Sequence, residues 1–308
     1  MCLRPSFWIL FVERLLTMKV KQYRYDNGDF DLADLPTTPD QKVVDEGEIK
    51  KQLTKNSKQL KELQKKLVAT REQGLVLVLQ GMDAAGKDSL VAHVFAGVNP
   101  AGFQVASFKQ PSSEELAHDF LWRINQKLPE RGMIGIFNRS YYEDVLISRV
   151  HPQILLDENL PGVHSLDDID DNFFNHRYND IQHYEEYLNH CGYQVIKFFL
   201  HLSKQEQKRR FAARIERPEK NWKFSAADIH ERRYWDSYQE AYQVALSKTA
   251  TKKNPWYIIP GDDKGFERLV ASNILLERLK QMKLAFPKMS AAASAELVKA
   301  MAELNQEK

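Results

Sequence analysis

Short apolar runs alternate with longer segments of helical periodicity through the middle of the chain. The apolar runs cover residues 75–79, 103–108, 133–137, 193–200 and 256–259, and the segments between them are long enough for helices. Strands separated by helices of this length form parallel βαβ units with right-handed crossovers. The pattern therefore predicts an α/β fold around a parallel sheet.

The segments that flank this alternation differ from it in composition. Residues 19–45 are polar, which predicts an arm over the surface, and residues 288–308 are rich in alanine, which predicts a terminal helix or tail. Between residues 47 and 71, leucines recur at helical spacing. The many lysines of this predicted helix form mainly a solvated face, and some of them are available to a polyanion. Residues 1–17 are interpreted as an upstream start artefact or a disordered arm.

Composition and charge exclude several classes of protein. The chain has 308 residues, of which 43% are apolar and 28% charged, so it has room for one large α/β domain with additions. A net charge of +2 gives no overall field for nucleic acid. Cys2 and Cys191 form neither a disulfide framework nor a metal motif, which favours a reducing, cytoplasmic location. The apolar stretch 7–12 is too short to span a bilayer, so no membrane is expected.

The first predicted strand ends in a glycine-bounded loop that closes with a lysine. Residues 81–87 read Gly-Met-Asp-Ala-Ala-Gly-Lys and fit G-x-x-x-x-G-K, the phosphate-binding loop (P-loop) between a buried strand and a helix. Small residues allow successive N–H groups to point at phosphate oxygens, and the next helix directs the positive end of its dipole at the same anion. Lys87 adds a full positive charge. The loop therefore predicts a phosphate site.

The loop departs from the usual pattern in its polar residues. Asp88 stands where Ser or Thr usually ligates Mg²⁺, and Ser89 follows it. Asp83 places a carboxylate inside the loop. Both carboxylates fit a metal between protein and phosphate, because Mg²⁺ prefers one or two carboxylates together with phosphate oxygens and water. For Asp88 the alternative is a favourable position in the first helical turn.

Polar side chains follow three further predicted strands, where the carboxyl ends of a parallel sheet gather ligands. At the end of the third strand, Asn138 can orient a metal-bound water and Arg139 can bind phosphate through its fork of donors. The alternative for Arg139 is an ion pair with Glu143 or Asp144 on the next helical turn. The three polar segments are residues 108–112, 138–144 and 260–264.

A basic segment, residues 204–233, follows the fourth predicted strand. A break at residues 217–225 separates two predicted helices, and Ser225 reads as the N-cap of the second. A lid at this place would bring cations onto a transferring phosphoryl group and exclude water. The alternative is a solvated helical face paired with glutamates, which is weakest for the residues that flank the break. These are Arg214, Arg217, Lys220 and Lys223.

Several blocks of this sequence, in this order, resemble the polyphosphate kinase 2 family. The block at residues 137–145, with Asn138 and Glu143, is most similar to class III. Members of this class pass phosphate from inorganic polyphosphate to nucleoside mono- and diphosphates. The resemblance covers about residues 19–285. The six blocks are residues 81–88, 97–100, 108–116, 120–123, 137–145 and 218–225.

The resemblance implies a three-layer αβα P-loop kinase fold with a helical lid. It divides the chain into an arm (1–45), a phosphotransferase domain (46–285) with its lid at about 204–248, and a C-terminal helix or tail (286–308). It also implies Mg²⁺ or Mn²⁺, reversible transfer of phosphate from inorganic polyphosphate to adenine or other purine nucleotides, and assembly as a homodimer or homotetramer. Family members often have Gly-Thr where this chain has Ser89-Leu90.

The resemblance also implies a set of site residues. The catalytic residues expected are Asp83, Lys87, Asn138, Arg139, Glu143 and Arg214, with Asp83 and Asn138 at the metal. Phosphate and polyphosphate are expected at Gly81, Ala84, Ala85, Gly86, Asp88, Ser89, Arg149, Arg217, Lys220, Lys223, Arg232 and Arg233. The nucleotide is expected at Asn99, Phe108, Lys109 and Arg123.

Two other functions use a P-loop and remain open from the sequence. An ATP-dependent nucleotide kinase of thymidylate-kinase type shares the P-loop and the lid. A P-loop ATPase bound to nucleic acid would use the basic helices on a phosphate backbone, although no array of aromatic and basic residues of the base-stacking kind accompanies them. Base preference and the favoured acceptor also remain open.

Overall fold

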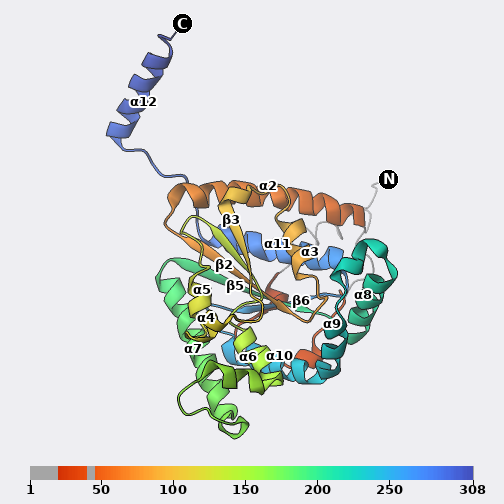
Figure 1. Cartoon of the computed structure of the whole chain (residues 1–308). Coiled ribbons are helices and arrows are strands. Elements are labelled where there is room, and N and C mark those ends of the chain that lie inside the picture. Colours follow the sequence, from red (N-terminus) through yellow and green to blue (C-terminus); the bar gives the residue numbers. More distant parts are fainter. Residues whose placement is uncertain (1–19, 40–45, 308) are drawn as a thin grey trace, which may run out of the picture.

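A six-stranded sheet forms the centre of the protein (Figure 1). The computed structural model describes residues 20–39 and 46–307, so the interpretation of residues 1–17 lies outside the described residues. The strand order is β1-β6-β5-β2-β4-β3. All five predicted strands are confirmed and run parallel, whereas β1, which the sequence pattern did not predict, pairs antiparallel with β6. The strands are β1 Arg24–Tyr25, β2 Gly74–Gly81, β3 Phe103–Ser107, β4 Ile134–Asn138, β5 Tyr193–His201 and β6 Trp256–Pro260.

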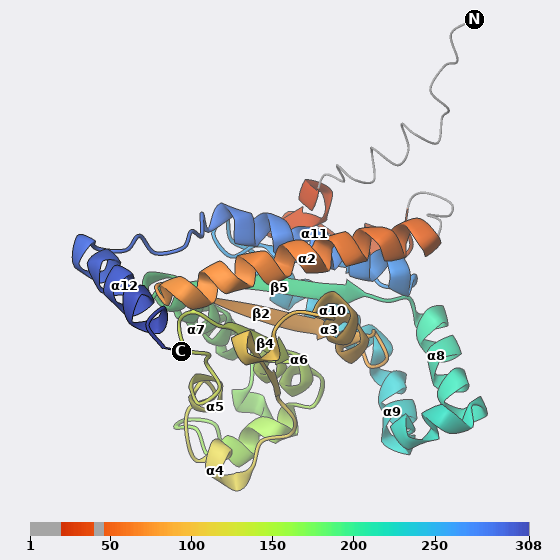
Figure 2. The same cartoon turned by 90° about the horizontal axis from the view of Figure 1, so that it is seen from above.

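Helices cover both faces of the sheet, which confirms the three-layer fold (Figures 1 and 2). One face carries α2 Glu46–Thr70, α3 Lys87–Val94 and α11 Lys264–Gln281, and the other carries α6 Glu143–Val150, α7 Asp171–His190 and α10 Trp235–Thr249. The remaining α-helices are α4 Ser113–Leu116, α5 Trp122–Asn125, α8 Lys204–Glu216, α9 Ala226–Glu231 and α12 Ala291–Leu304. Short 3-10 helices span Val20–Tyr23, Leu32–Asp34, Pro100–Gly102, Pro152–Glu158, Leu166–Asp168, Pro218–Lys223 and Arg232–Tyr234.

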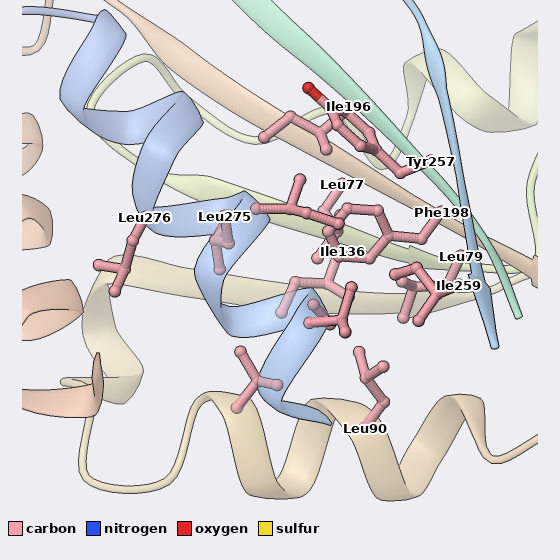
Figure 3. Close-up of a cluster of buried hydrophobic side chains, with 14 of the residues drawn as sticks. Leu77, Leu79, Leu90, Ile136, Ile196, Phe198, Tyr257, Ile259, Leu275 and Leu276 are labelled. Carbon is pink, nitrogen blue, oxygen red and sulfur yellow. The ribbon is translucent and has the colours of Figure 1, made fainter. Parts of the chain in front are cut away.

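The central strand β2 supplies side chains to two separate cores. Leu77 and Leu79 pack with α3 and α11 (Figure 3), whereas Val76 and Val78 pack with α6, α7 and α10. Every residue of β2 is buried, as expected for a parallel strand with helices on both faces, and this explains its unbroken apolar run. The two cores hold β2 rigidly, and its last residue begins the P-loop.

The parallel register aligns the strand ends that carry polar residues. Leu79 of β2 lies opposite Asn138 of β4, and Gly81 lies opposite Leu200 of β5. The basic segment begins directly after β5, and its helices α8 and α9 project past the carboxyl ends of the strands (Figure 2). The fold therefore places the P-loop, the Asn138 segment and the basic segment at one edge of the sheet.

The C-terminal segment stands apart from the layers. The predicted terminal helix is present as α12, which projects away from the body in Figure 1, and all its residues are at least partly exposed. Within the described residues, no helix has the length and apolar character needed to cross a bilayer.

Candidate active site

The P-loop is a tight turn whose backbone needs small residues. Gly86, the N-cap of α3, has φ +114° and Ala84 has φ +64°, both in the left-handed region. Glycine adopts this conformation readily, whereas other residues do so at a cost. The turn brings the N-terminal end of α3 to the mouth of the loop, where its unpaired N–H groups and its dipole favour an anion.

Lys87 lies inside the loop. Its Nζ donates to the carbonyl of Gly81 at 2.6 Å and to that of Met82 at 3.3 Å. Burial of the ammonium lowers the pKa of Lys87, and the nearby Arg139 guanidinium lowers it further, whereas the carboxylate of Asp83 raises it. An anion in the loop would restore the balance of charge, because two cations face one another there.

Arg139 connects two carboxylates at the end of β4. Its guanidinium donates to Asp83 Oδ1 at 2.8 Å and lies 3.9 Å from Glu143 Oε2. The ion pair with Glu143 that the sequence suggested as an alternative is therefore present, together with a contact to the P-loop. Arg139 also has φ +63°. A left-handed conformation at a non-glycine residue is characteristic of functional sites.

Asp88 and Asn138 are joined across the site. Asn138 Nδ2 donates to Asp88 Oδ1 at 2.5 Å, and Asp88 also occupies the first turn of α3, as its alternative reading predicted. Ser89 Oγ accepts a hydrogen bond of 2.7 Å from Arg268 of α11. The structure thus brings Asp83, Asp88 and Asn138 to one rim of the P-loop.

A buried arginine that the sequence analysis did not assign to the site supports the P-loop from below. Arg210 Nη1 donates to the carbonyls of Ala84 and Ala85 at 2.9 and 2.6 Å, and Nη2 donates to that of Gly261 at 2.5 Å. The same guanidinium pairs with Glu206 at 2.8 Å. Arg210 holds these carbonyls inward, and the Ala85 N–H donates to the Met82 carbonyl at 3.0 Å, so the loop is fixed by contacts on both sides.

A buried glutamate lies beside the loop. Glu267 of α11 is 2% exposed, and a Cβ on Gly86 would lie 3.4 Å from its Oε1. Burial raises the pKa of Glu267 to about 8, against the lowering effect of Arg210 and Arg268. Arg210 and Glu267 carry no motif of their own, and only their place in α8 and α11 brings them beneath the P-loop.

The basic segment forms the opposite wall of a cleft of about 340 Å³ over the P-loop. Among the described residues, nine Lys or Arg side chains and two Asp side chains line this P-loop cleft. Four of the cations flank the break between α8 and α9, as the sequence predicted. They are Arg214, Arg217, Lys220 and Lys223.

Arg214 also fixes the shape of this wall. It pairs with Asp228 of α9 at 3.1 Å and donates to the carbonyl of Lys223 at 3.4 Å. Ser225 is the N-cap of α9 as predicted, but its side chain makes no capping hydrogen bond to this helix. The turn between α8 and α9 is therefore held mainly by the Arg214–Asp228 ion pair and by Asn221. The side-chain amide of Asn221 donates to the carbonyls of residues 214 and 215.

Other predicted residues lie away from the cleft. Phe108, Lys109 and Arg123 line a separate hollow of about 560 Å³ beside the edge strand β3. Arg123 is buried there, donates to the carbonyl of Lys109 at 2.8 Å and lies 3.7 Å from Asp144. Burial raises the pKa of Asp144 to about 7, although Arg123 opposes this.

Three further residues are not brought to the P-loop cleft. Asn99 caps the 3-10 helix before β3, at the opposite end of the sheet, and is held by Gln64. Arg149 pairs with Asp171 of α7 at 2.7 Å, and Arg233 is exposed. Arg232 does reach the site, because it lines a small hollow with Asp83 and Arg139. For the other three, binding roles stay predictions.

The donor set at the rim of the P-loop fits Mg²⁺. The carboxylates of Asp83 and Asp88 and the amide of Asn138 all line the P-loop cleft. Mg²⁺ takes one or two carboxylates and completes its shell with phosphate oxygens and water. Within residues 20–39 and 46–307, no group of three or more His, Cys, Asp or Glu forms a metal cage, so phosphate oxygens would have to complete the shell.

Comparison with known proteins identifies the family. The family model described as Polyphosphate kinase 2 (PPK2) matches residues 43–287. The chain belongs to the polyphosphate kinase 2 family. It is 46% identical over 290 residues to the ADP-polyphosphate phosphotransferase of Rhodopseudomonas palustris, covering 94% of this chain and 99% of that protein. The AMP/ADP-polyphosphate phosphotransferase of Meiothermus ruber is 41% identical over 237 residues, with coverages of 77% and 83%.

A solved structure supports the same assignment. The polyphosphate kinase 2 of Arthrobacter aurescens TC1 is similar with a TM-score of 0.81 and 37% sequence identity, covering 91% of this chain and 96% of that one. Membership in the polyphosphate kinase 2 family makes the chain a phosphotransferase. It also gives the cationic wall of the P-loop cleft a natural ligand class, the phosphate chain.

Proposed function

We propose that this enzyme transfers phosphoryl groups from inorganic polyphosphate to ADP and AMP, in a reversible reaction. The observation that carries the proposal is the charge of the P-loop cleft, where nine cationic side chains face two aspartates. A single nucleotide needs few of these cations, whereas a donor and an acceptor that are both polyanions need many. The family assignment and the printed names of the relatives support the same reaction.

Phosphoryl transfer depends mainly on position and charge neutralisation. Lys87 and the N–H groups of the P-loop would hold the reacting phosphates, and Arg139 would bind the phosphoryl group as it moves between donor and acceptor. Asp83 and Glu143 orient Arg139 through the ion pairs described above. Arg214 and the lid lysines would hold the donor chain and exclude water when the basic segment closes.

The proposed metal is Mg²⁺, or Mn²⁺ in its place. Asp83, Asp88 and Asn138 would hold it, and when bound it supplies positive charge between the phosphates of donor and acceptor. If this holds, turnover stops on addition of a chelator and returns with Mg²⁺, while Asp83→Asn raises the Mg²⁺ concentration needed for half-maximal rate. Turnover that survives the chelator would contradict the proposal.

The acceptor range is proposed to be that of class III, with both AMP and ADP. The relative from Meiothermus ruber is named for both acceptors and that from Rhodopseudomonas palustris for ADP. The hollow of about 560 Å³ beside β3, with Lys109 at its edge, is the proposed position of the nucleotide. The comparisons do not favour the thymidylate-kinase type or the nucleic-acid ATPase.

A homodimer or homotetramer in the cytoplasm is also proposed. α12 exposes Leu297, Val298, Met301 and Leu304 along one face, and an exposed apolar face of this kind favours association. Cys191 is a free thiol, which suits a reducing compartment. Light scattering of the full chain and of Leu297→Lys/Met301→Lys would test the assembly, because a monomer in both cases would contradict it.

The acceptor assignment has a direct test. The protein is incubated with Mg²⁺, long-chain polyphosphate and either AMP or ADP, and the nucleotides are separated by chromatography. The proposal predicts ADP and then ATP from AMP, and ATP from ADP, only when polyphosphate is present. Formation of ADP from AMP without later ATP would contradict the class III range, and no product from either acceptor would contradict the proposed function.

A further inference from the structure

A second and larger hollow adjoins the P-loop cleft. It has a volume of about 950 Å³ and lies between α2, the end of α3 and the start of α11. We call it the α2 groove. Arg209 and Lys264 line both the α2 groove and the P-loop cleft, so the two hollows share a boundary. In Figure 1, α2 and α11 lie on the same face of the sheet and the lid helix α8 stands at one end of them.

The α2 groove is basic along its length. Its described cations are Lys50, Lys58, Lys61, Arg209, Lys264 and Arg268, and its carboxylates are Glu46, Asp262 and Asp263. Two of these carboxylates are already engaged. Asp263 accepts from the backbone N–H of Phe266 at 2.8 Å, and Asp262 accepts from the Thr37 hydroxyl at 2.9 Å and the Ser203 N–H at 2.8 Å. With six cations against three carboxylates, positive charge predominates in the α2 groove.

Three lysines of α2 form one stripe along this groove. Lys50 and Lys61 are eleven residues apart, a separation of roughly 16 Å along a helix that leaves both on nearly the same face, and Lys58 lies between them. None of the three forms an ion pair within the described residues, whereas Lys51 and Lys65, outside the groove, pair with Glu48 and Glu62. The charge of the stripe is thus available to a ligand.

The junction of the cleft and the groove concentrates like charge. Burial lowers the pKa of Lys264, and so do the positive charges of Arg210, Lys220 and Arg268 around it. Lys264 receives only a weaker opposing effect from Glu267. An anion that passes through the junction would offset this repulsion.

We propose that the α2 groove binds the distal part of the polyphosphate donor, whose reacting end occupies the P-loop. The inference rests on the proposed function and extends the donor site beyond the P-loop. The added track is about 16 Å long, which is the separation of Lys50 and Lys61 calculated from the rise per residue of a helix. A long chain reaches the lysine stripe through the junction at Lys264, whereas a chain of a few phosphates ends inside the P-loop cleft. The groove therefore makes affinity depend on donor length.

The test compares a groove variant with a variant of equal charge elsewhere on α2. The groove variant is Lys50→Glu/Lys58→Glu/Lys61→Glu, and the control is Lys51→Glu/Lys55→Glu/Lys65→Glu, whose residues are exposed and do not line the groove. KM is measured at constant ionic strength for polyphosphate fractions of increasing chain length, with ADP as acceptor. Circular dichroism confirms that both variants are folded.

The wild type and the control should show KM falling as the donor lengthens, and the groove variant should lose this fall. Because each exposed ionic contact changes binding by a few-fold, the groove variant should raise KM for long chains about tenfold. A chain-length dependence that survives in the groove variant, or that is lost equally in the control, would overturn the inference. A selective rise in KM for ADP would place the nucleotide in the groove and overturn it as well.

A binding measurement separates this inference from the proposed function. Calorimetric titration with long-chain polyphosphate, without nucleotide, should show weaker binding and a smaller dependence on salt for the groove variant than for the control. Equal binding by the two variants would overturn the groove alone. If the wild type binds polyphosphate through the groove but forms no ATP, the proposed function fails while the groove stands.

Discussion

Replacement of Arg210 by alanine tests the claim that a buried guanidinium shapes the P-loop. Arg210 is 7% exposed and donates to four backbone carbonyls, two of them in the loop, at 2.5 to 3.4 Å. It also pairs with Glu206, whose side chain is 11% exposed. Arg210→Ala leaves these acceptors without their donor, in a region that water reaches poorly.

The expected loss of stability is large. Removing one partner of a buried ion pair costs about 3–5 kcal/mol, because the other charge is left uncompensated. Each charge-assisted hydrogen bond contributes roughly 1.5–3 kcal/mol, but these terms overlap, so we expect about 3–5 kcal/mol in total. The loop should also lose its position, and misplacement of a reacting group by about 1 Å lowers kcat/KM about 100-fold.

Arg209 supplies a matched control on the same helix. It pairs with the same Glu206 at 2.5 Å, but its side chain is 69% exposed, so Arg209→Ala should cost about 0.2–1 kcal/mol. Urea denaturation gives the unfolding free energies, and steady-state rates with polyphosphate and ADP give kcat/KM. The reasoning is refuted if Arg210→Ala is destabilised no more than Arg209→Ala, or if its kcat/KM stays within twofold of the wild type.

Three further predictions concern the loop, the lid and the buried glutamate. Lys87→Ala should leave the fold intact and lower kcat at least 10²-fold, because a preorganised cation at the reacting phosphates is lost; near-normal turnover would contradict the role given to Lys87. Lys220→Glu/Lys223→Glu should raise KM for long polyphosphate about tenfold and more than KM for ADP, since each exposed contact changes binding a few-fold; equal rises would argue against a donor channel at the lid. Glu267 has its pKa raised from 4.5 to about 8, so the folded state binds the proton more tightly and its stability falls as pH rises between these values. Relative to Glu267→Gln, the wild type should lose about 2 kcal/mol of unfolding free energy between pH 6 and pH 8; parallel profiles in urea denaturation would show that Glu267 does not titrate in this range.

The strands and the P-loop could be predicted because their signals are local. The fully buried strand β2 is an unbroken apolar run, and the loop after it needs glycine at φ +114° and a lysine one residue later. The parallel register aligns Asn138 with the end of β2. The order of the strands in the sequence and their right-handed crossovers were sufficient to place these segments at the carboxyl-end edge of the sheet.

The features that sequence analysis missed depend on contacts between distant segments. β1 has two residues, too few for a periodic pattern, and it exists because it pairs with β6. Arg210 reads as one more cation on a basic helix, and only its hydrogen bonds to the P-loop carbonyls distinguish it from the exposed Arg209. Asn99, expected at the nucleotide from the family resemblance, caps a 3-10 helix at the other end of the sheet, and its binding role stays a prediction.

Phosphorus NMR of a single reaction tests the central claim most directly. Purified protein is mixed with Mg²⁺, long-chain polyphosphate and ADP, beside a control that contains ATP and AMP but no polyphosphate. The account predicts that the β- and γ-phosphate signals of ATP grow in step with the loss of internal polyphosphate signal, and that Lys87→Ala shows neither change. If the folded wild type leaves polyphosphate intact while the control converts ATP and AMP to ADP, the donor is ATP and the account is contradicted.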